Sequence, residues 1–268
     1  GEYGDLSLYN TDFDSEVTIT SADPDQQATL SSVSLVNVAN ITFDNIFVDF
    51  EPDEDTLEWS PAVRIVDSEG VSIQNSIIEG GNSVAGVSED SERGEQGAQG
   101  ILGWPTGLGI SVSGSTGTNI ENNDISQFHR GIVLSKVDGI NVTGTEIHHV
   151  RASTLAGGDI QNAVIEDNYF HSSHPWKYGG SGDHGDYIFF WTGVDQTTPN
   201  QNIVIKNNAL EQGDGFSILG IMFQDQSLAK VGSTNVLIEG NVIQNGHNLG
   251  IVLDGLTDVE VLNNTLLL

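Results

Sequence analysis

One segment of the sequence, residues 171–191, concentrates side chains that could carry acid–base chemistry. It reads His-Ser-Ser-His-Pro-Trp-Lys-Tyr-Gly-Gly-Ser-Gly-Asp-His-Gly-Asp-Tyr-Ile-Phe-Phe-Trp and holds three of the seven histidines and two of the four tryptophans. Its glycines allow the backbone to approach a ligand closely. Asp183, His184 and Asp186 come directly before a predicted strand that begins at Tyr187. We therefore expect a catalytic group at the entry to this strand.

The chemistry open to such groups on a uronate polysaccharide is removal of a proton next to a carboxylate. The reaction needs a cation that neutralises the substrate carboxylate, a base for the ring proton, and an acid for the following step. If the acid protonates the leaving oxygen, the chain is cleaved by β-elimination. If a proton returns to the opposite ring face, the sugar is epimerised. The residues leave both outcomes open.

Each of these roles has a candidate in or near this segment. His184 is predicted to be the base or the acid, because imidazole can act as either near neutral pH. Asp183 and Asp186 would orient His184 or hold Ca²⁺, which could also bridge an acidic sugar to an acidic protein. No organic cofactor is expected. The other predicted catalytic residues are the partner of His184, Tyr178 or Tyr187; the neutralising cation, Lys177 or Arg151; and His174.

The elements that position these residues are predicted by a recurring Asn-x-apolar step. Thr145-Glu-Ile147 replaces the step once, and the intervals of 22 and 23 residues around it match the interval from Asn241 to Asn264. One coil is therefore about 22 residues, and longer intervals are one coil plus an inserted loop. Short Val- and Ile-rich runs broken by Gly and Asn favour strands and turns over helices. The step occurs at Asn45, Asn75, Asn123, Asn168, Asn208, Asn241 and Asn264.

Coils of this size are stable only when stacked, about 4.8 Å apart. An Asn at the same corner of every coil can adopt a left-handed bend and pass amide hydrogen bonds to the corners above and below. This pattern resembles the right-handed parallel β-helix superfamily, the pectate-lyase-like solenoids, over nearly all of the chain. The resemblance implies an all-β, right-handed parallel β-helix with an asparagine ladder and loop insertions on one face. A β-sandwich is the alternative.

The insertions are predicted to flank one sheet of this rod. Those at about 79–107, 172–185 and 212–219 enter the sheet from one side, and those at about 193–200 and 226–234 leave it at the other. Insertions in these places would wall a groove several coils long, which fits a polymeric ligand.

Aromatic side chains in the predicted strand could bind sugar rings in this groove. Alternation puts Ile188 and Phe190 inside and Tyr187, Phe189 and Trp191 outside, where the rings would stack on sugars or pack beneath a loop. Positions six residues past the repeated step form a vertical stripe, which could be structural or functional: His129, Arg151, His174, Asp214 and His247. The predicted substrate-binding residues are Trp176, Phe189, Trp191, His171, Gln224 and Asp254.

The composition limits the partners. With 38 acidic and 8 basic side chains the formal charge is −30, and there is no run of Lys or Arg, so nucleic acid is not expected as a partner. No apolar segment is long enough for membrane insertion. So acidic a surface suits a saline, marine or calcium-rich setting. There is no cysteine, which removes disulfide and thiol chemistry.

The chain is interpreted as a single domain, residues 1–268. It begins at Gly1 without a signal-peptide pattern and ends at Leu268 in an apparent strand, so we expect caps or further domains in a longer parent protein. An extracellular, secreted or virion-surface location is expected. The protein would be a monomer, or a homotrimer if it is a viral fibre.

A local motif supports the assignment of chemistry. Tyr178-Gly-Gly-Ser-Gly-Asp183-His184 resembles the Tyr-Gly-x-Asp-Pro-His motif of the mannuronan C5-epimerases, which are also β-helices, although the Pro is missing and the Tyr-to-Asp spacing is longer. The leading prediction is a polysaccharide lyase or C5-epimerase acting on an acidic glycan. The alternative is a phage tail fibre, tailspike or adhesin that binds surface glycans. The third is a glycoside hydrolase with carboxylates from Asp183, Asp186, Asp225 and Asp254.

Overall fold

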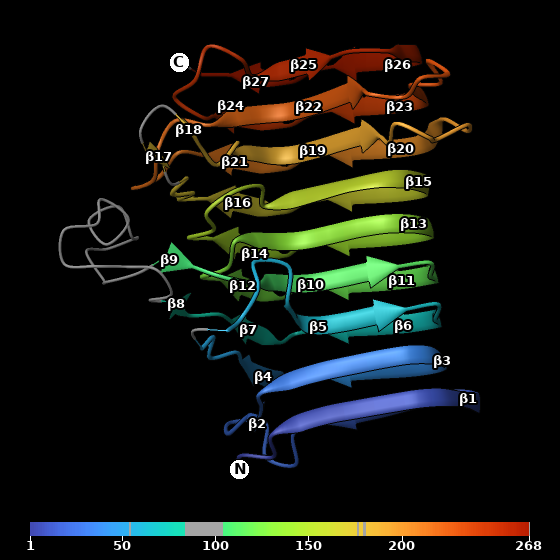
Figure 1. The fold of residues 1–268 in the computed structure, drawn as a ribbon, viewed down its shortest axis with the longest axis vertical. Coiled ribbons are helices and arrows are strands. Elements are labelled where there is room, and N and C mark those ends of the chain that lie inside the picture. Colours follow the sequence, from blue (N-terminus) through green and yellow to red (C-terminus); the bar gives the residue numbers. More distant parts are fainter. Residues whose placement is uncertain (54, 84–103, 176, 179–180, 268) are drawn as a thin grey trace.

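The chain folds into a rod of stacked coils built from parallel strands, with its two termini at opposite ends (Figure 1). The computed structural model describes residues 1–53, 55–83, 104–175, 177–178 and 181–267, apart from the side chains of residues 83, 104, 177, 178, 181 and 182. These residues form strands and turns, which confirms the all-β prediction for the described part of the chain. That part contains no helix long and apolar enough to cross a membrane.

Within the described residues, sheet A is a ladder of nine very short parallel strands. In spatial order they are β2 (Ala28–Leu30), β4 (Ile46–Asp49), β7 (Ile77–Glu79), β12 (Asp124–Ser126), β14 (Glu146–His148), β16 (Tyr169–His171), β21 (Ala209–Glu211), β24 (Val242–Gln244) and β27 (Thr265–Leu266). Residues in this sheet pair at separations that differ from coil to coil. Asp124 pairs with Glu146 and Glu146 with Tyr169, whereas Tyr169 pairs with Ala209, because an insertion lies between the last two strands.

In the part of the chain that the structure describes, sheet B has fourteen strands and bends along its length, so that each coil crosses it in two halves. The strands are β1 (Asp5–Thr20), β3 (Ser32–Asp44), β5 (Pro61–Val66), β6 (Glu69–Gln74), β10 (Leu108–Ser113), β11 (Thr116–Glu121), β13 (Arg130–Thr143), β15 (Leu155–Glu166), β19 (Asp186–Thr192), β20 (Asn200–Lys206), β22 (Leu219–Asp225), β23 (Ser233–Glu239), β25 (Ile251–Leu253) and β26 (Leu256–Leu262). Two antiparallel hairpins add β8 (Asn82–Ser83) with β9 (Trp104–Pro105) and β17 (Lys177–Tyr178) with β18 (Ser181–Gly182).

The bend in sheet B comes from residues with a positive φ at equivalent positions of successive coils. They are Asn37, Asp67, Gly114, Lys136 and Asp159. A left-handed residue turns the chain sharply, and Asn, Asp and Gly adopt that conformation at the lowest cost. We call the part before the bend the first half of sheet B; it contains β5, β10, β19, β22 and β25 and the first residues of β13 and β15.

The core is a stack of apolar side chains in register along the rod axis. One row in the first half of sheet B is completely buried and consists of Val63, Ile110, Ile132, Leu155, Ile188 and Ile221. Burying each such side chain stabilises the fold by about 1.5–3 kcal/mol. Neighbouring coils also stack aromatic rings, as in Phe190 and Phe223, whose centroids are 5.4 Å apart. The core therefore fixes the register in which the outer face presents its side chains.

Buried amide side chains link the coils at the entry to sheet A. Oδ1 of Asn208 accepts bonds from the backbone N and from Nδ2 of Asn168, at 3.0 and 2.9 Å, while Nδ2 of Asn208 donates to Oδ1 of Asn241 at 2.9 Å. Asn241 makes the same contacts with Asn264, at 3.0 and 2.8 Å. Thr145 makes fewer of these bonds. Its backbone N donates to Oδ1 of Asn168, but its hydroxyl has one proton to donate where the Asn amide has two.

The assignment of Asn45 and Asn75 to this stack is wrong by one residue. Ser76 occupies the stacked position, where its backbone N donates to Oδ1 of Asn123 at 3.0 Å and its hydroxyl accepts from the backbone N of Ile46 at 3.1 Å. Asn45 and Asn75 lie one position earlier, at the left-handed bend, with φ of 52° and 50°. The left-handed bend therefore precedes the buried amide instead of coinciding with it.

Replacing Asn208 by alanine is expected to destabilise the fold by roughly 2–4 kcal/mol, because it leaves the backbone N of Asn168 and the carbonyl of Ile165 without their buried partners. The midpoint of urea unfolding measures this effect. The control is Asn141→Ala, which removes an exposed amide bond between coils and should change stability by less than about 0.5 kcal/mol. Equal effects of the two substitutions would contradict a special role for the buried amide.

The insertions lie where the sequence predicts them, at the two ends of the first half of sheet B (Figure 1). Those between sheet A and sheet B follow β7, β16 and β21, and those at the other end follow β19 and β22. Residues 84–103, most of the insertion after β7, lie outside the described residues.

Candidate active site

A buried ion pair stands at the side of the first half of sheet B where the large insertions enter. Nε of Arg151 lies 2.7 Å from Oδ2 of Asp183, and Nη2 lies 2.5 Å from Oε1 of Glu58. Nη1 donates to the carbonyl of Pro105 at 3.4 Å. The side chain of Arg151 is 3% exposed and that of Asp183 is 11% exposed. Arg151 thus joins the segment between β4 and β5, strand β9 and the insertion after β16, which are far apart in the sequence.

Two further side chains surround this pair. Nε2 of His129 lies 3.8 Å from Oδ1 of Asp183, and Nδ1 lies 3.4 Å from the carbonyl of Glu58. Burial, together with the charges of Arg151 and Arg130, lowers the pKa of His129 to about 4, so the ring is neutral at pH 7. Arg130 begins β13. Its buried Nε has no hydrogen-bond partner among the described residues.

His184 and Asp186 form a dyad beside this cluster. Nδ1 of His184 lies 2.9 Å from Oδ2 of Asp186, and the His184 side chain is 67% exposed while that of Asp186 is 1% exposed. Burial raises the pKa of Asp186, and the hydrogen bond from His184 acts in the opposite direction. With the proton on Nδ1 held by the carboxylate, Nε2 of His184 presents a lone pair to solvent. The dyad can therefore take a proton from a bound molecule.

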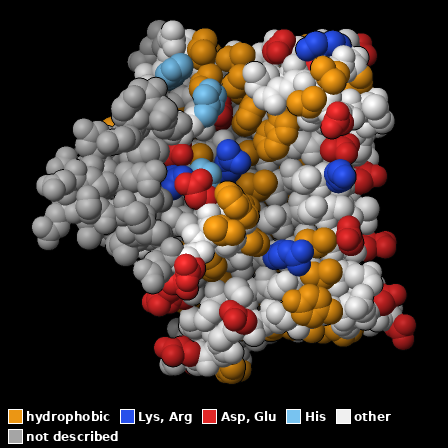
Figure 2. Space-filling model, viewed as in Figure 1, with side chains coloured by type: hydrophobic (Ala, Val, Ile, Leu, Met, Phe, Trp, Pro, Cys, Tyr) orange, Lys and Arg blue, Asp and Glu red, His pale blue; other side chains and the backbone are white. Residues whose placement is uncertain are grey.

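Aromatic rings continue from the dyad across the sheet. The ring centroid of Phe189 lies 6.5 Å from that of His184 and 5.2 Å from that of Trp191. Both side chains are half-buried on the outer face. Gly158 in the neighbouring coil makes room for the indole, since a Cβ there would lie 3.0 Å from Nε1 of Trp191. Figure 2 shows hydrophobic side chains gathered along this face beside a group of basic, acidic and histidine side chains.

The aromatic path ends in a cavity of about 510 Å³ at the bend of sheet B. Trp191 and Gly158 line it on the sheet side, and the insertion after β19 lines it with Gly193 and residues 194–198. This insertion is one of the predicted walls. The path therefore runs from the dyad over Phe189 and Trp191, which both lie on β19, and ends in this cavity.

Several predicted site residues lie elsewhere. Tyr187 is wrong as an outward side chain, because it is completely buried and its hydroxyl donates to the carbonyl of Glu211 in the next coil. Burial also raises its pKa, which disfavours the phenolate. His171 and His174 belong to a separate histidine cluster, in which His171 contacts Glu146 and His174 faces Asp214.

The remaining predicted residues are only partly placed. Gln224 pairs with Trp191 on the adjacent strand, so it borders the aromatic path. Asp254 is exposed at the end of β25, one coil further on. Trp176 and the side chains of Lys177 and Tyr178 lie outside the described residues. The roles predicted for these three residues stay predictions.

The comparisons with known proteins agree with this architecture. Residues 108–267 match a family model described as "Right handed beta helix region". The chain belongs to the right-handed β-helix family. A search of the curated proteins finds no match to the sequence.

Several solved structures superpose on this chain. PfbA, a surface adhesin of Streptococcus pneumoniae, superposes with a TM-score of 0.52 at 13% identity, over 99% of this chain and 70% of that chain. The A-module of the Azotobacter vinelandii mannuronan C-5 epimerase AlgE6 gives 0.45 at 12% identity, over 95% and 73%. The catalytic domain of a GH87 α-1,3-glucanase gives 0.47 at 11% identity, over 98% and 63%. At 13% identity the likeness to PfbA concerns the fold alone.

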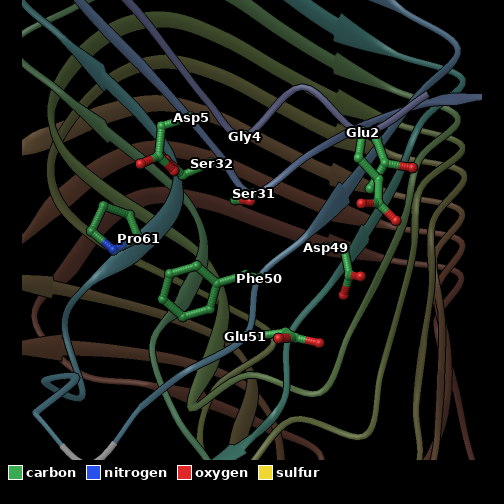
Figure 3. Close-up of a pocket in the computed structure, with 10 residues that line it drawn as sticks. Glu2, Gly4, Asp5, Ser31, Ser32, Asp49, Phe50, Glu51 and Pro61 are labelled. Atoms are coloured by element: carbon green, nitrogen blue, oxygen red, sulfur yellow. The ribbon is translucent and has the colours of Figure 1, made fainter.

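A second cavity of this β-helix lies in the first coils and has a volume of about 650 Å³ (Figure 3). Its lining includes Glu2, Asp5, Asp49 and Glu51, and no Lys, Arg or His. A cavity of this charge repels an anionic sugar, so the dyad and its aromatic path are the better candidate for a uronate.

The predicted calcium ligands of the β-helix both make ion pairs within the protein. Asp183 contacts Arg151 and Asp186 contacts His184. The Arg151 guanidinium occupies the place that a cation would take beside Asp183. Calcium binding at these carboxylates stays a prediction, and it would require these ion pairs to open.

Acidification is expected to destabilise the β-helix through His129. Its pKa is lowered from 6.5 to about 4, so between these values the unfolded chain binds a proton that the folded chain does not. The contribution of His129 to the free energy of unfolding is therefore complete above pH 6.5. It falls by up to roughly 3 kcal/mol as the pH drops to 4. Unfolding midpoints in urea measured from pH 7 to pH 4 test this. The variant His129→Gln should lose that part of the pH dependence; an unchanged slope would contradict the assignment.

Proposed function

We propose that this β-helix is a polysaccharide lyase or C5-epimerase that acts on a uronate glycan across the first half of sheet B. The observation that carries the proposal is the His184–Asp186 dyad, which stands at the start of an aromatic path that leads into a cavity. An exposed imidazole held by a buried carboxylate is suited to proton abstraction. Aromatic faces beside it are suited to pyranose rings.

An anionic substrate needs a nearby cation in a protein of net charge −30. Arg130 and Arg151 lie at the site beside the neutral ring of His129, but Arg151 is already paired with Asp183 and Glu58. Arg130, whose Nε has no hydrogen-bond partner in the described part of the chain, is the better neutraliser of a substrate carboxylate. We assign Arg151 the role of holding Asp183 and the insertion that carries His184.

The proposed reaction begins when Nε2 of His184 takes the ring proton next to the substrate carboxylate. The electron pair of the broken C–H bond moves onto the carboxylate, where the charge of Arg130 stabilises it. In the lyase case this pair then forms a C=C bond as the glycosidic C–O bond breaks and its oxygen is protonated. In the epimerase case a proton returns to the same carbon from the opposite face. Tyr178 remains the predicted acid, since Tyr187 is buried.

The experiment incubates the protein with alginate, pectate and glycosaminoglycans, with amylose as the neutral control. Ultraviolet absorbance of an unsaturated uronate identifies a lyase, and deuterium uptake at the ring carbon in D₂O without cleavage identifies an epimerase. Trp191→Ala should weaken binding of the active glycan by roughly tenfold, the loss of one stacking ring. Absence of both signals with every acidic glycan would contradict the proposal.

Binding without chemistry is the second candidate, because the aromatic path and the cavity would serve it equally well. An adhesin or fibre would bind a glycan with an affinity that depends on Trp191 and not on His184.

The glycosidase is less favoured. Hydrogen bonds from Ser227 and Thr192 lower the pKa of Asp225 to about 2, which keeps this carboxylate ionised and unsuited to protonate a leaving group. Any of these substrates would place the protein outside the cell or on a virion surface.

A further inference from the structure

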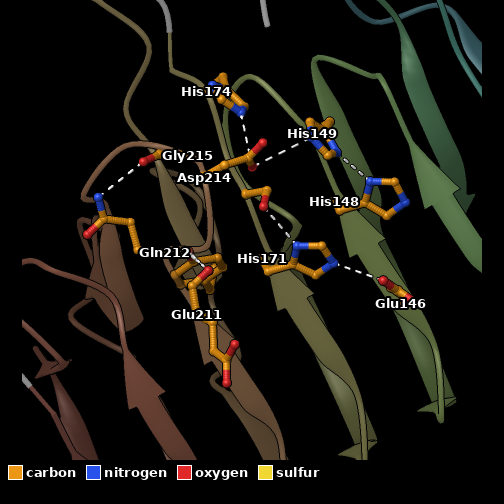
Figure 4. Close-up of polar contacts among 11 residues, drawn as sticks. Glu146, His148, His149, His171, His174, Glu211, Gln212, Asp214 and Gly215 are labelled. Atoms are coloured by element: carbon orange, nitrogen blue, oxygen red, sulfur yellow. Dashed lines mark hydrogen bonds and ion pairs between the residues drawn. The ribbon is translucent and has the colours of Figure 1, made fainter. Parts of the chain in front are cut away.

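A second cluster of titratable side chains lies on the turns that follow three successive strands of sheet A (Figure 4). His149 follows β14, His174 lies in the insertion after β16, and Asp214 lies in the insertion after β21. Nε2 of His149 is 3.7 Å and Nε2 of His174 is 3.8 Å from the same oxygen, Oδ1 of Asp214. Both distances are too long for a hydrogen bond.

The two imidazole nitrogens are buried and aimed at this oxygen without a partner. Nε2 of His149 and Nε2 of His174 have no hydrogen bond within the described part of the chain. Buried polar atoms are almost always paired, so two that converge on one carboxylate indicate a site for a cation. We propose that His149, His174 and Asp214 bind a divalent transition metal ion of the Zn²⁺ class.

The spacing of the three atoms fits such an ion. All three lie within 4.8 Å of one another, so a common centre lies no more than roughly 2.4 Å from each atom. Bonds from Zn²⁺ to His nitrogen and to carboxylate oxygen are about 2.0–2.2 Å, so shifts of a few tenths of an ångström close the site. Two imidazoles and one carboxylate favour Zn²⁺ over Ca²⁺ and Mg²⁺, which prefer all-oxygen sites.

The residues around the cluster orient its ligands. Nε2 of His148 lies 2.9 Å from Oδ1 of Asp124, and Nδ1 of His148 lies 2.5 Å from Nδ1 of His149. If His148 donates its Nε2 proton to Asp124, its Nδ1 accepts the proton of His149 Nδ1. His149 Nε2 then carries a free lone pair. Metal-bound histidines commonly donate their second N–H in this way.

The carboxylate of Asp214 is held in place by the neighbouring coil. Ser172 hydrogen-bonds to Asp214, and Nδ1 of His171 lies 2.9 Å from the same hydroxyl. Gly213 has φ of +56°, and a Cβ there would lie 2.4 Å from Oγ of Ser172, so only glycine lets this turn approach. Asp214 is 66% exposed, which leaves a coordination position open to water. Because His174 and His184 lie in one insertion, the ion would anchor the segment that carries the proposed base.

Metal binding by the purified full chain tests the proposal independently of any activity on glycans. After treatment with a chelator, titration with ZnCl₂ followed by calorimetry should give one bound ion per chain, and Co²⁺ should bind with visible absorption typical of imidazole coordination. His149→Ala, His174→Ala and Asp214→Ala should each weaken binding at least a hundredfold. His247→Ala, in the equivalent turn of the next coil, should leave it unchanged.

A positioning variant separates this site from adventitious binding by surface histidines. Asp124→Asn should weaken Zn²⁺ binding by roughly tenfold, because it removes the carboxylate at the end of the His148–His149 chain. Circular dichroism of each variant checks that the coils are intact. No stoichiometric binding of Zn²⁺ or Co²⁺ by the folded chain would overturn the proposal, as would binding by Asp214→Ala with unchanged affinity.

Discussion

Replacing His184 by alanine is expected to lower turnover of an acidic glycan by roughly 10²–10⁴-fold, the range that a positioned general base contributes. The side chain is 67% exposed and its described contacts are with Asp186 and Phe189, so the coils should fold unchanged. The loss should appear in kcat, with little change in the affinity for the glycan, because Phe189 and Trp191 remain. Initial rates of unsaturated uronate formation or of deuterium uptake measure it.

Two further variants sharpen this test. Asp186→Asn keeps the size of the side chain but removes the charge that holds the Nδ1 proton of His184, and it should lower turnover by at least tenfold. Lys206→Met removes a cation that faces Glu166 beyond the bend of sheet B, and it should leave turnover within about twofold of the unmodified chain. Full activity in His184→Ala would remove the dyad from the mechanism while leaving the fold assignment untouched.

Replacing Arg151 by methionine should cost about 3–5 kcal/mol of stability, the largest effect expected in this chain outside the core. Methionine fills a similar volume, so the loss reflects the carboxylate of Asp183, which is 11% exposed in the folded chain and would lose the guanidinium as its partner. Glu58 is 49% exposed and can turn to solvent at little cost. The urea midpoint measures the change. The control is Arg64→Met, which removes an exposed cation from β5. It should shift stability by less than about 0.5 kcal/mol.

The double variant Arg151→Met with Asp183→Asn separates charge from packing. If the single loss arises from an uncompensated buried carboxylate, neutralising Asp183 should recover a substantial part of it. Additive losses in the double variant would instead show that Arg151 acts through packing alone. The same pair of variants tests whether the insertion carrying His184 depends on this ion pair, because turnover should fall together with stability.

The sequence predicts the solenoid because a repeated residue at a repeated interval is a local signal that needs no knowledge of distant contacts. The exact position of the stacked residue in each coil is harder to predict, since Asn is favoured for different reasons at two adjacent positions. One position bends the chain to positive φ, as at Asn75, and the next stacks a buried amide, as at Asn123. Where a coil has Asn at only one of the two positions, as at Asn75 and Ser76, the repeat is easily aligned one residue too early.

The candidate site is predictable where it depends on neighbours in the sequence, as His184 and Asp186 do. Tyr187 shows the limit of strand alternation, because Asp186, Tyr187 and Ile188 are all buried where the insertion turns into the strand. Glu58 and Arg130 were missed. Glu58 is 93 residues from Arg151, and only the stacking of coils brings them together. For Arg130, its place beside the repeated corner position of His129 was a usable signal.

The unequal spacing of paired residues also bears on how such a protein can be altered. Residues of adjacent coils that contact one another at the entry to sheet A are 22 residues apart in one place and 40 in another, yet the strands that follow pair in parallel in both places. Lengthening a flexible loop twofold adds only about 0.6 kcal/mol of closure entropy. The insertion after β19, in which residues 194, 195, 197 and 198 are exposed, is thus an opening for a longer grafted segment, through which a new sugar specificity could be added without changing the buried core.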